Sequence, residues 1–365
     1  MKKWIGFLTG ILLLAAAFLA HHSVVHSALR TLPEAALATA SRGISVQAFS
    51  ALSKVKNVTP VLKEPGYLQG HSVTAYYTTA DAPALCGVGM LYGSFSPWQD
   101  GDIVIGRALA AELFMTENAV GLTVRYNGRE YIVRGVYAPP EDIVARMSRT
   151  VEPEVWLPLA SYPDQDAGIG EYLVGLHGGL KGSVHYTRFA PELELRLGTN
   201  LTFHSAYNFD ETRRLAGESE SLLGLLFALS FCVLCGYWAV RLGMGLFKAV
   251  RDNTDDSLPR ALGKRRREVF LFAVSLLCLA GGAFWTSKAG FTLFLPQDYI
   301  TGGKGIVDYI VGNFQLRNGK ADLFLCAYSS HVKTVLALLD VCIAVLLVKT
   351  VYRAARAVKA VQDRI

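Results

Sequence analysis

The sequence predicts an α+β extracytoplasmic domain on a membrane-embedded α-helical region, and three observations support this fold class. Apolar residues make up 52% of the chain and charged residues only 18%, with a mean hydropathy of +0.30, which suits a chain that combines membrane spans with a folded domain. Four apolar runs are each close to the roughly 20 residues that cross a bilayer. Between the first and second runs, short strand and helix patterns alternate over enough residues to bury their own core.

The predicted sidedness depends on the polar stretch 251–270, which lies between the second and third apolar runs. This stretch is strongly basic, and a short Lys/Arg-rich loop between two spans is normally held in the cytoplasm. Basic residues also concentrate at Lys2 and Lys3 and in the tail from Lys349 to Arg364, where they flank apolar runs. Positive-inside anchoring therefore explains the net charge of +6, and nucleic acid is not an expected partner. We expect a multi-pass cell-membrane protein with both termini in the cytoplasm.

The first predicted transmembrane helix comprises residues 1–26. Its apolar run follows Lys2 and Lys3, and it is either a retained span or a signal peptide cleaved before Ala28; both alternatives export the residues that follow. Three histidines come directly after the apolar run: His21, His22 and His26. No carboxylate or other ligand lies near them in the sequence, so we interpret them as an interfacial helix end and predict no metal site.

Residues 27–208 form the predicted extracytoplasmic domain. Thr31 and Glu34 bracket Pro33 in a capping-box arrangement, which predicts a helix that starts here and runs towards Ser41. A three-residue apolar recurrence predicts an amphipathic helix over residues 44–55. Short strands are expected at 58–62 and 73–78, with Gly66 and Gly70 between them.

The second half of this domain has sharper signals. We predict a strand at 103–105, a helix at 107–114 and a β-hairpin over 122–136. Asn127 and Gly128 lie between the hairpin arms, and both tolerate the positive φ angles of a type I′ turn. Further elements are predicted as follows: a strand at 155–159, a helix at 190–197 and a strand at 201–204.

The C-terminal half is predicted to be mainly helical and membrane-bound. Its predicted parts are a stalk and second transmembrane helix at 209–247, a cytoplasmic coupling loop at 248–267, a third span at 268–286, an extracytoplasmic loop at 287–331, a fourth span at 332–352 and a cytoplasmic tail at 353–365. Asp340 lies near the middle of the last span, where an ionisable group is costly. The sequence offers no basic partner at that depth, so we expect Asp340 to be either protonated or hydrogen-bonded across helices.

The cysteines indicate packing more than chemistry. Four of them lie inside apolar runs, where they act as small polarisable residues: Cys232, Cys235, Cys278 and Cys342. Cys86 and Cys326 lie outside the predicted spans. A disulfide between these two is compatible with the sequence, but nothing in the sequence requires it.

Several stretches resemble the MacB/FtsX family of ABC-transporter permeases. Residues 121–136 (GLTVRYNGREYIVRGV) are similar to the family's glycine, strand, turn, strand, Gly-Val signature. Residues 101–114 (GDIVIGRALAAELF) are similar to the strand and helix that precede it, and residues 155–159 (VWLPL) to the strand that follows. Residues 260–264 (RALGK) resemble the family's Ala-Leu-Gly motif before the third span.

The resemblance implies one span before a large extracytoplasmic domain, three spans after it, and a separate ATP-binding subunit as partner. It implies that this subunit contacts the cytoplasmic loop at Arg260, Ala261, Leu262, Gly263, Lys264, Arg265, Arg266, Arg267 and Glu268. The basic cluster alone would also fit binding to anionic membrane lipid. The Ala-Leu-Gly sequence placed directly before it favours the contact with an ATPase.

The chain has no P-loop, no Gly-x-Ser-x-Gly and no His-Glu-x-x-His motif. We therefore predict that it is not an enzyme and needs no cofactor. Our main hypothesis is a permease subunit that couples ATP hydrolysis by its partner to movement of the extracytoplasmic domain, paired with itself or with a related permease. The alternative is a membrane-anchored sensor or scaffold that binds an extracytoplasmic ligand or protein without ATP. Nothing in the sequence identifies a substrate.

Overall fold

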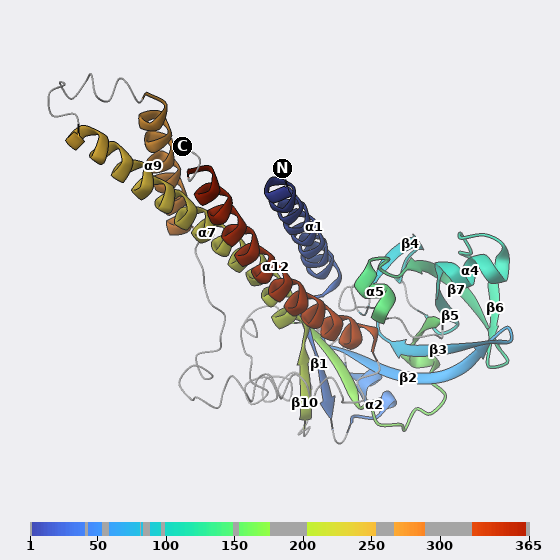
Figure 1. Ribbon diagram of the computed structural model, residues 1–365. Coiled ribbons are helices and arrows are strands. Elements are labelled where there is room, and N and C mark those ends of the chain that lie inside the picture. Colours follow the sequence, from blue (N-terminus) through green and yellow to red (C-terminus); the bar gives the residue numbers. More distant parts are fainter. Residues whose placement is uncertain are drawn as a thin grey trace. The chain divides into compact units, whose positions relative to one another are not determined.

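The computed structural model describes residues 2–40, 43–52, 58–80, 82, 88–95, 99–148, 153–175, 203–252, 266–288 and 323–362. The chain divides into two compact units, whose elements are labelled in Figure 1. The helical unit comprises Met1–Val25, Gly217–Phe294 and Leu336–Ile365, and the sheet unit comprises His26–Ala216 and Leu295–Val335.

The sheet unit contains a mixed ten-stranded sheet, counted over the described residues. Its strands are β1 (Ala35–Ala40), β2 (Val58–Leu68), β3 (His71–Thr78), β4 (Gly89–Gly93), β5 (Asp102–Gly106), β6 (Thr123–Tyr126), β7 (Arg129–Ala138), β8 (Glu154–Pro158), β9 (Glu171–Gly175) and β10 (Phe203–Asn208). They follow the order β10-β1-β9-β2-β3-β8-β5-β7-β4, while β6 pairs with β2 and β7. The β3–β8 and β5–β7 pairs are parallel, and the other pairs are antiparallel.

Strand β2 joins the two halves of this sheet. Its first residues, 58–61, pair with β9, and residues 62–68 pair with β3. The first four residues are all buried, whereas the later ones alternate between exposed and buried positions. One long strand therefore belongs to a fully covered part of the sheet at one end and to a half-solvated part at the other.

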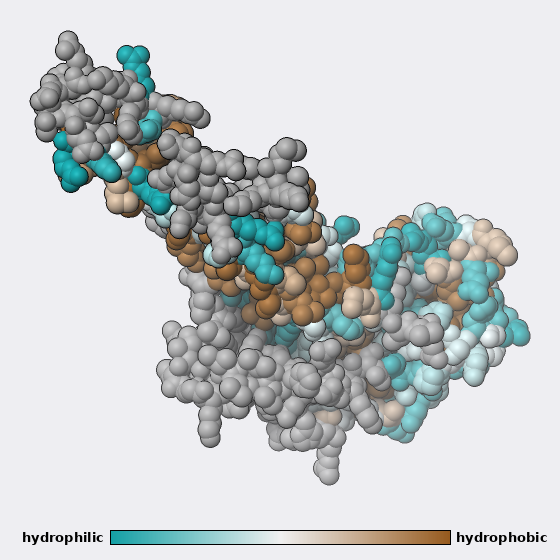
Figure 2. Space-filling view, viewed as in Figure 1, coloured by the Kyte–Doolittle hydropathy of each residue, from teal (hydrophilic) through white to brown (hydrophobic). Residues whose placement is uncertain are grey.

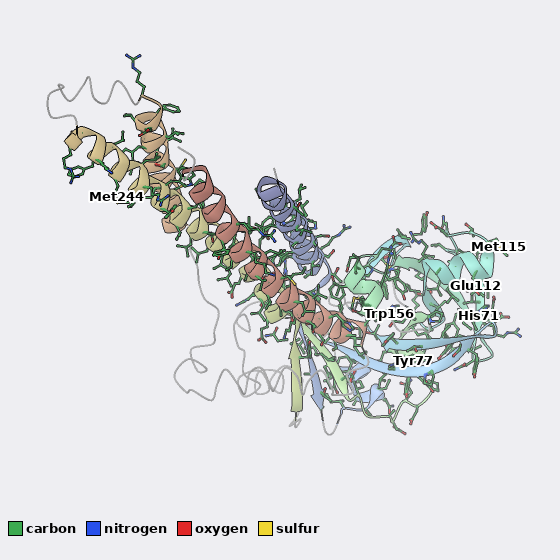
Figure 3. The ribbon with its side chains drawn as sticks, viewed as in Figure 1. His71, Tyr77, Glu112, Met115, Trp156 and Met244 are labelled. Carbon is green, nitrogen blue, oxygen red and sulfur yellow. The ribbon has the colours of Figure 1, made fainter. Side chains whose placement is uncertain are left out.

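The core of the sheet unit is apolar and aromatic. Ile105 of β5 and Leu157 of β8 are fully buried on adjacent strands. Tyr76 and Trp156 stack with their ring centroids 5.0 Å apart, and Tyr77 meets Tyr162 edge-on at 4.9 Å. Figure 3 labels Tyr77 and Trp156 within this unit. Burial of each such side chain contributes about 1.5–3 kcal/mol, so this core explains why the strands stay together.

Four long helices account for most of the remaining described residues: α1 (Lys2–Thr31), α7 (Phe209–Asp252), α9 (Arg266–Lys288) and α12 (Phe324–Gln362). Three of them contain stretches long and apolar enough to cross a membrane, at Thr9–Thr31, Phe209–Lys248 and Phe324–Arg353. The apolar part of α9 is shorter, at Glu268–Gly282, so its role as a span stays a prediction. Figure 2 shows hydrophobic surface along the described helices, as expected for contact with lipid.

Shorter elements complete the sheet unit. They are α2 (Val46–Ala51), α4 (Arg107–Phe114), α5 (Ile143–Ser148) and the 3₁₀ turn η1 (Leu159–Ser161). The predicted helix at 107–114 is confirmed at both ends, and the predicted hairpin is present as β6 and β7. Asn127 and Gly128 adopt φ angles of 47° and 84°, as the turn prediction requires.

One predicted element is wrong, and several have other bounds than predicted. Thr31 ends α1 instead of capping a new helix, and the alanine-rich residues 35–40 form β1. This segment pairs with β9 on one side and β10 on the other, and two ladders outweigh a modest helix propensity. The helix expected at 44–55 is limited to α2, and the last strand extends to Asn208. The strand expected at 58–62 continues to Leu68, so Gly66 lies inside β2 and only Gly70 lies between β2 and β3. The predicted helix at 190–197 lies outside the described residues.

Candidate functional site

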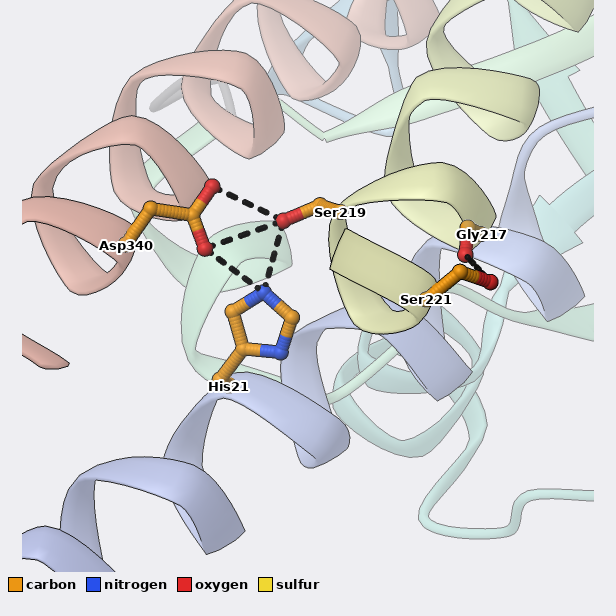
Figure 4. Close-up of polar contacts among 5 residues, drawn as sticks. All are labelled: His21, Gly217, Ser219, Ser221 and Asp340. Carbon is orange, nitrogen blue, oxygen red and sulfur yellow. Dashed lines mark hydrogen bonds and ion pairs between the residues drawn. The ribbon is translucent and has the colours of Figure 1, made fainter. Parts of the chain in front are cut away.

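A polar cluster joins three helices of the helical unit. Its members are His21 of α1, Ser219 of α7 and Asp340 of α12 (Figure 4). The Ser219 hydroxyl lies 2.8 Å and 3.0 Å from the two carboxylate oxygens of Asp340. Nε2 of His21 lies 2.9 Å from Ser219 Oγ and 3.2 Å from Asp340 Oδ1. The cluster therefore links residues that are about 200 and 120 positions apart in the sequence.

The contacts of the cluster are satisfied when Asp340 accepts from both neighbours. Ser219 has a single hydroxyl proton, which it donates to the Asp340 carboxylate. The His21 tautomer with a proton on Nε2 donates to the same carboxylate and to the serine oxygen next to it. Nδ1 of the same ring is buried and has no hydrogen-bond partner among the described residues. The Asp340 carboxylate thus receives donors from two other helices.

Burial makes these contacts more valuable than surface hydrogen bonds. The His21 side chain is 0% exposed and that of Asp340 is 30% exposed. Interactions with a charged group strengthen as water is removed, and removal of one partner then leaves an unpaired group behind. A neighbouring pair, His22 and Glu220, lies 2.8 Å apart but is more open, with side chains 53% and 37% exposed. We therefore regard the first cluster as the functional candidate.

An apolar layer supports the polar cluster. Leu14, Leu223 and Ile343 form a buried group from the same three helices. Phe18 and Phe227 meet edge-on beside it, with ring centroids 5.5 Å apart. Leu223 is one turn beyond Ser219 and Ile343 is about one turn beyond Asp340, so an apolar layer lies about one turn along α7 and α12 from the polar cluster.

Helices α7 and α9 pack closely through glycines. A Cβ atom added at Gly236 would lie 3.3 Å from Leu279, and one at Gly243 would lie 3.2 Å from Phe272. At Gly282 it would lie only 2.5 Å from Sγ of Cys232. Small residues allow helix backbones to approach closely in a membrane. These glycines allow α9 to pack closely against α7.

The predicted site residues divide into two groups in the structure. Asp340 is hydrogen-bonded across helices, which is one of the two states expected from the sequence. The expectation that it has no basic partner is wrong, since His21 lies within 3.2 Å. Sequence spacing missed this pair because His21 and Asp340 meet only when α1 and α12 pack side by side. Two polar residues inside two separate apolar stretches were the available signal.

The coupling residues are only partly described. Arg260, Ala261, Leu262, Gly263, Lys264 and Arg265 lie outside the described residues. Arg266, Arg267 and Glu268 form the first turn of α9, where Arg266 is exposed. Glu268 in this first turn interacts favourably with the helix dipole. Their contact with an ATPase stays a prediction.

Together, the sheet unit and the apolar helices define a membrane protein with a folded domain. Residues 5–192 match the family model described as MacB-like periplasmic core domain, and the chain belongs to this family. Its members are the permeases of ABC transporters, as the sequence resemblance suggested.

The chain is also similar to solved structures at low sequence identity. The periplasmic region of MacB from Actinobacillus actinomycetemcomitans is 16% identical, with a TM-score of 0.39 and coverage of 51% of this chain and 94% of that one. The extracellular domain of the noncanonic ABC-type transporter YknZ from Gram-positive bacteria is 13% identical, with a TM-score of 0.33 and coverage of 47% and 100%. No curated protein matches the chain.

Proposed function

We propose that this chain is the permease subunit of a MacB/FtsX-type ABC transporter, which couples ATP hydrolysis by a separate subunit to movement of the extracytoplasmic domain. The single observation that carries the proposal is the continuity of α7. This helix begins at Phe209, directly after strand β10, and continues without interruption to Asp252 at the edge of the basic loop. One helix thus connects a strand of the extracytoplasmic domain to the predicted coupling loop.

The length of α7 suits this role. Its 44 residues span about 66 Å at 1.5 Å per residue, whereas the hydrocarbon core of a bilayer is about 30 Å thick. The helix therefore extends well beyond the apolar layer. A continuous helix transmits a displacement along its axis, because each turn is bonded to the next.

The joint between the sheet and α7 is firmly held. The Asn208 side chain, at the end of β10, accepts a hydrogen bond from the Glu211 backbone N–H at 3.2 Å and so caps the helix. Arg213 donates to Glu34 at 2.8 Å, which connects the second turn of α7 to the segment before β1. Thr212 and Ser329 hydroxyls lie 2.6 Å apart and connect α7 to α12. Movement of α7 would therefore move the strands attached to it.

The polar cluster has a mechanical role in this proposal. By linking α1, α7 and α12, His21, Ser219 and Asp340 would make the three helices respond together when the loop after α7 is displaced. The glycine contacts between α7 and α9 would do the same on the other side of the loop. In this arrangement α9 is a fourth span, both termini are cytoplasmic, and the permease pairs with itself or with a related chain.

Two variants test the two halves of the proposal. The first, Leu262→Asp with Gly263→Asp, should abolish co-purification of an ATP-binding subunit from the native host membrane. The second, Ser221→Pro, places a helix breaker in the interior of α7, where proline costs about 3 kcal/mol. It should leave co-purification intact but abolish ATP-dependent change in proteolysis of the sheet unit, whereas Ser221→Ala should preserve both.

Recovery of no ATP-binding subunit with the unaltered chain would contradict the proposal and favour the sensor or scaffold alternative. Unchanged ATP-dependent proteolysis in Ser221→Pro would refute α7 as the route of transmission.

A further inference from the structure

Helix α5 has an unusual exposed surface. Ile143 is 76% exposed and Met147 is 57% exposed, and the two side chains lie on the same side of the helix because they are four residues apart. Arg146 is exposed beside them. The opposite side is buried through Val144, Ala145 and Ser148. We refer to Ile143, Arg146 and Met147 as the α5 patch.

Both ends of α5 are attached to α12 within the sheet unit. Asp142 caps α5 by accepting from the Ala145 backbone N–H at 2.8 Å, and its other oxygen accepts from the Tyr328 hydroxyl at 3.3 Å. At the other end, Ser148 Oγ lies 2.9 Å from Nδ1 of His331. In Figure 1, α5 lies beside the start of α12. The two attachments and the buried side of the helix fix the direction of the α5 patch.

The positions of these attachments along α12 indicate at which level of the membrane α5 lies. Tyr328 and His331 lie in the first turns of the apolar stretch Phe324–Arg353 and just before residue 332, where the sequence predicts the span to begin. Four residues of helix from Tyr328 to Val332 measure about 6 Å. The polar interfacial layer on each side of the hydrocarbon core is itself about 5–7 Å thick. Helix α5 is therefore attached to α12 at the level of this layer.

The chemistry of the α5 patch matches this layer. Large apolar side chains next to an arginine are typical of segments that rest at the boundary between lipid headgroups and acyl chains. There the apolar groups leave water, while the guanidinium reaches phosphate oxygens. We propose that the α5 patch docks the extracytoplasmic domain onto the outer surface of the phospholipid bilayer. The proposal rests on α12 crossing the membrane, and it does not depend on coupling to an ATPase.

Polarity-sensitive fluorescence in nanodiscs tests this proposal with the full chain. The six native cysteines are replaced by alanine or serine, and an NBD probe is attached to Ile143→Cys or Met147→Cys. The matched control is Met115→Cys, because Met115 is 91% exposed and follows α4, which lies away from α5 within the sheet unit in Figure 1. Unchanged circular dichroism and a single gel-filtration peak establish that each labelled protein is folded.

We expect the probes at positions 143 and 147 to emit at shorter wavelength than the probe at 115. Phospholipids brominated in their upper acyl chains should quench these two probes and not the control. Replacement of Arg146 by glutamate should reduce the quenching more in discs that contain phosphatidylglycerol than in phosphatidylcholine alone, because only the former present net negative charge to the guanidinium.

Two results would overturn the proposal. The first is emission and quenching at positions 143 and 147 equal to those at 115, which would place the α5 patch in water. The second is a shift to shorter wavelength without quenching by brominated lipid, together with oxidative cross-linking of Ile143→Cys between two chains. That result would identify a second copy of the protein as the occupant of the patch.

Discussion

The two units of this protein arrange polarity in opposite ways. In the sheet unit, large apolar and aromatic side chains such as Leu157 and Tyr77 are buried. In the helical unit, Leu277 and Leu338 are 76% and 63% exposed, while His21 is completely buried. Each arrangement suits its solvent, because lipid accepts apolar surface and water does not. A substitution should therefore have an effect that depends on the unit more than on the residue type.

Truncation of leucine should give the largest difference between the units. Leu157→Ala removes a side chain that is 0% exposed in the sheet core, and we expect a loss of about 2–5 kcal/mol in the free energy of unfolding. Leu338→Ala removes one that is 63% exposed in the helical unit, and the loss should be below about 1 kcal/mol, since lipid fills the space. Thermal unfolding in nanodiscs measures both. Equal losses would contradict the assignment of Leu338 to a lipid-facing position.

Removal of a carboxylate from the polar cluster of the helical unit should also be destabilising, although removal of an exposed leucine from the same unit should not. Asp340→Ala takes the carboxylate away from the buried His21 and from Ser219, and removal of one partner from a buried pair costs about 3–5 kcal/mol. Because Asp340 is 30% exposed, we expect a smaller loss, of about 1–3 kcal/mol. The control is Glu220→Ala in the open pair with His22, which should cost about 0–1 kcal/mol.

A double-mutant cycle sharpens this prediction. His21→Ala and Asp340→Ala should be less destabilising together than the sum of the two single changes, because the second change removes a group that the first has already left unpaired. Thermal unfolding of the four proteins gives the interaction energy. Simple additivity would mean that the cluster contributes no coupling between α1 and α12.

Close packing of α7 and α9 provides a test inside the helical unit. A Cβ atom at Gly282 would approach Cys232 Sγ to 2.5 Å, whereas one at Gly281 would meet nothing within 4 Å. We expect Gly282→Ala to cost about 1 kcal/mol, at the lower end for overpacking, because the sulfur can shift. Gly281→Ala should be neutral or slightly stabilising. The addition of Cys232→Ala should restore stability to Gly282→Ala, and failure of this rescue would exclude the contact as the cause.

The sequence was most informative where local chemistry determines structure. The Asn127–Gly128 turn and helix α4 were predicted with correct boundaries, because positive φ angles and helix propensity act within a few residues. Strand β1 was predicted as a helix from the local capping-box pattern of Thr31 and Glu34, and only its partners β9 and β10 make it a strand. Those partners are more than 100 residues away, beyond the reach of any local pattern.

The polar cluster shows the same limit for the candidate site. Asp340 stood out because a carboxylate within an apolar run is costly wherever it lies. Its partners were not recognised, since Ser219 lies in a charged stretch and His21 was interpreted, with His22 and His26, as an interfacial helix end. The contact between α5 and α12 was likewise invisible, because Ser148 and His331 are 183 positions apart. The sequence identifies groups whose burial costs free energy, and tertiary packing determines which partners offset that cost.

The smallest predicted effect concerns a charge in the water-exposed part of the sheet unit. Asp100 accepts hydrogen bonds from Ser161 Oγ at 2.6 Å and from Arg129 Nη2 at 2.8 Å. The Ser161 hydrogen bond, followed by that of Arg129, holds the pKa of Asp100 below its ordinary value. The carboxylate thus stabilises the folded state at pH above about 3.9, its unfolded pKa, and this contribution is lost as the pH falls through the lower pKa of the folded state.

This pH dependence distinguishes a charge in water from a charge among membrane helices. Asp100 and Arg129 are 51% and 52% exposed, so the stabilisation should not exceed about 1 kcal/mol. Thermal unfolding between pH 5 and pH 3, about one unit on either side of the unfolded pKa, should be less steep in Asp100→Asn than in the unaltered chain. Ser161→Ala should give part of the same change, because it removes the largest cause of the shift. A larger loss for Asp100→Asn than for Asp340→Ala at neutral pH would contradict the contrast between the two units, since it would make the exposed carboxylate the more strongly compensated one.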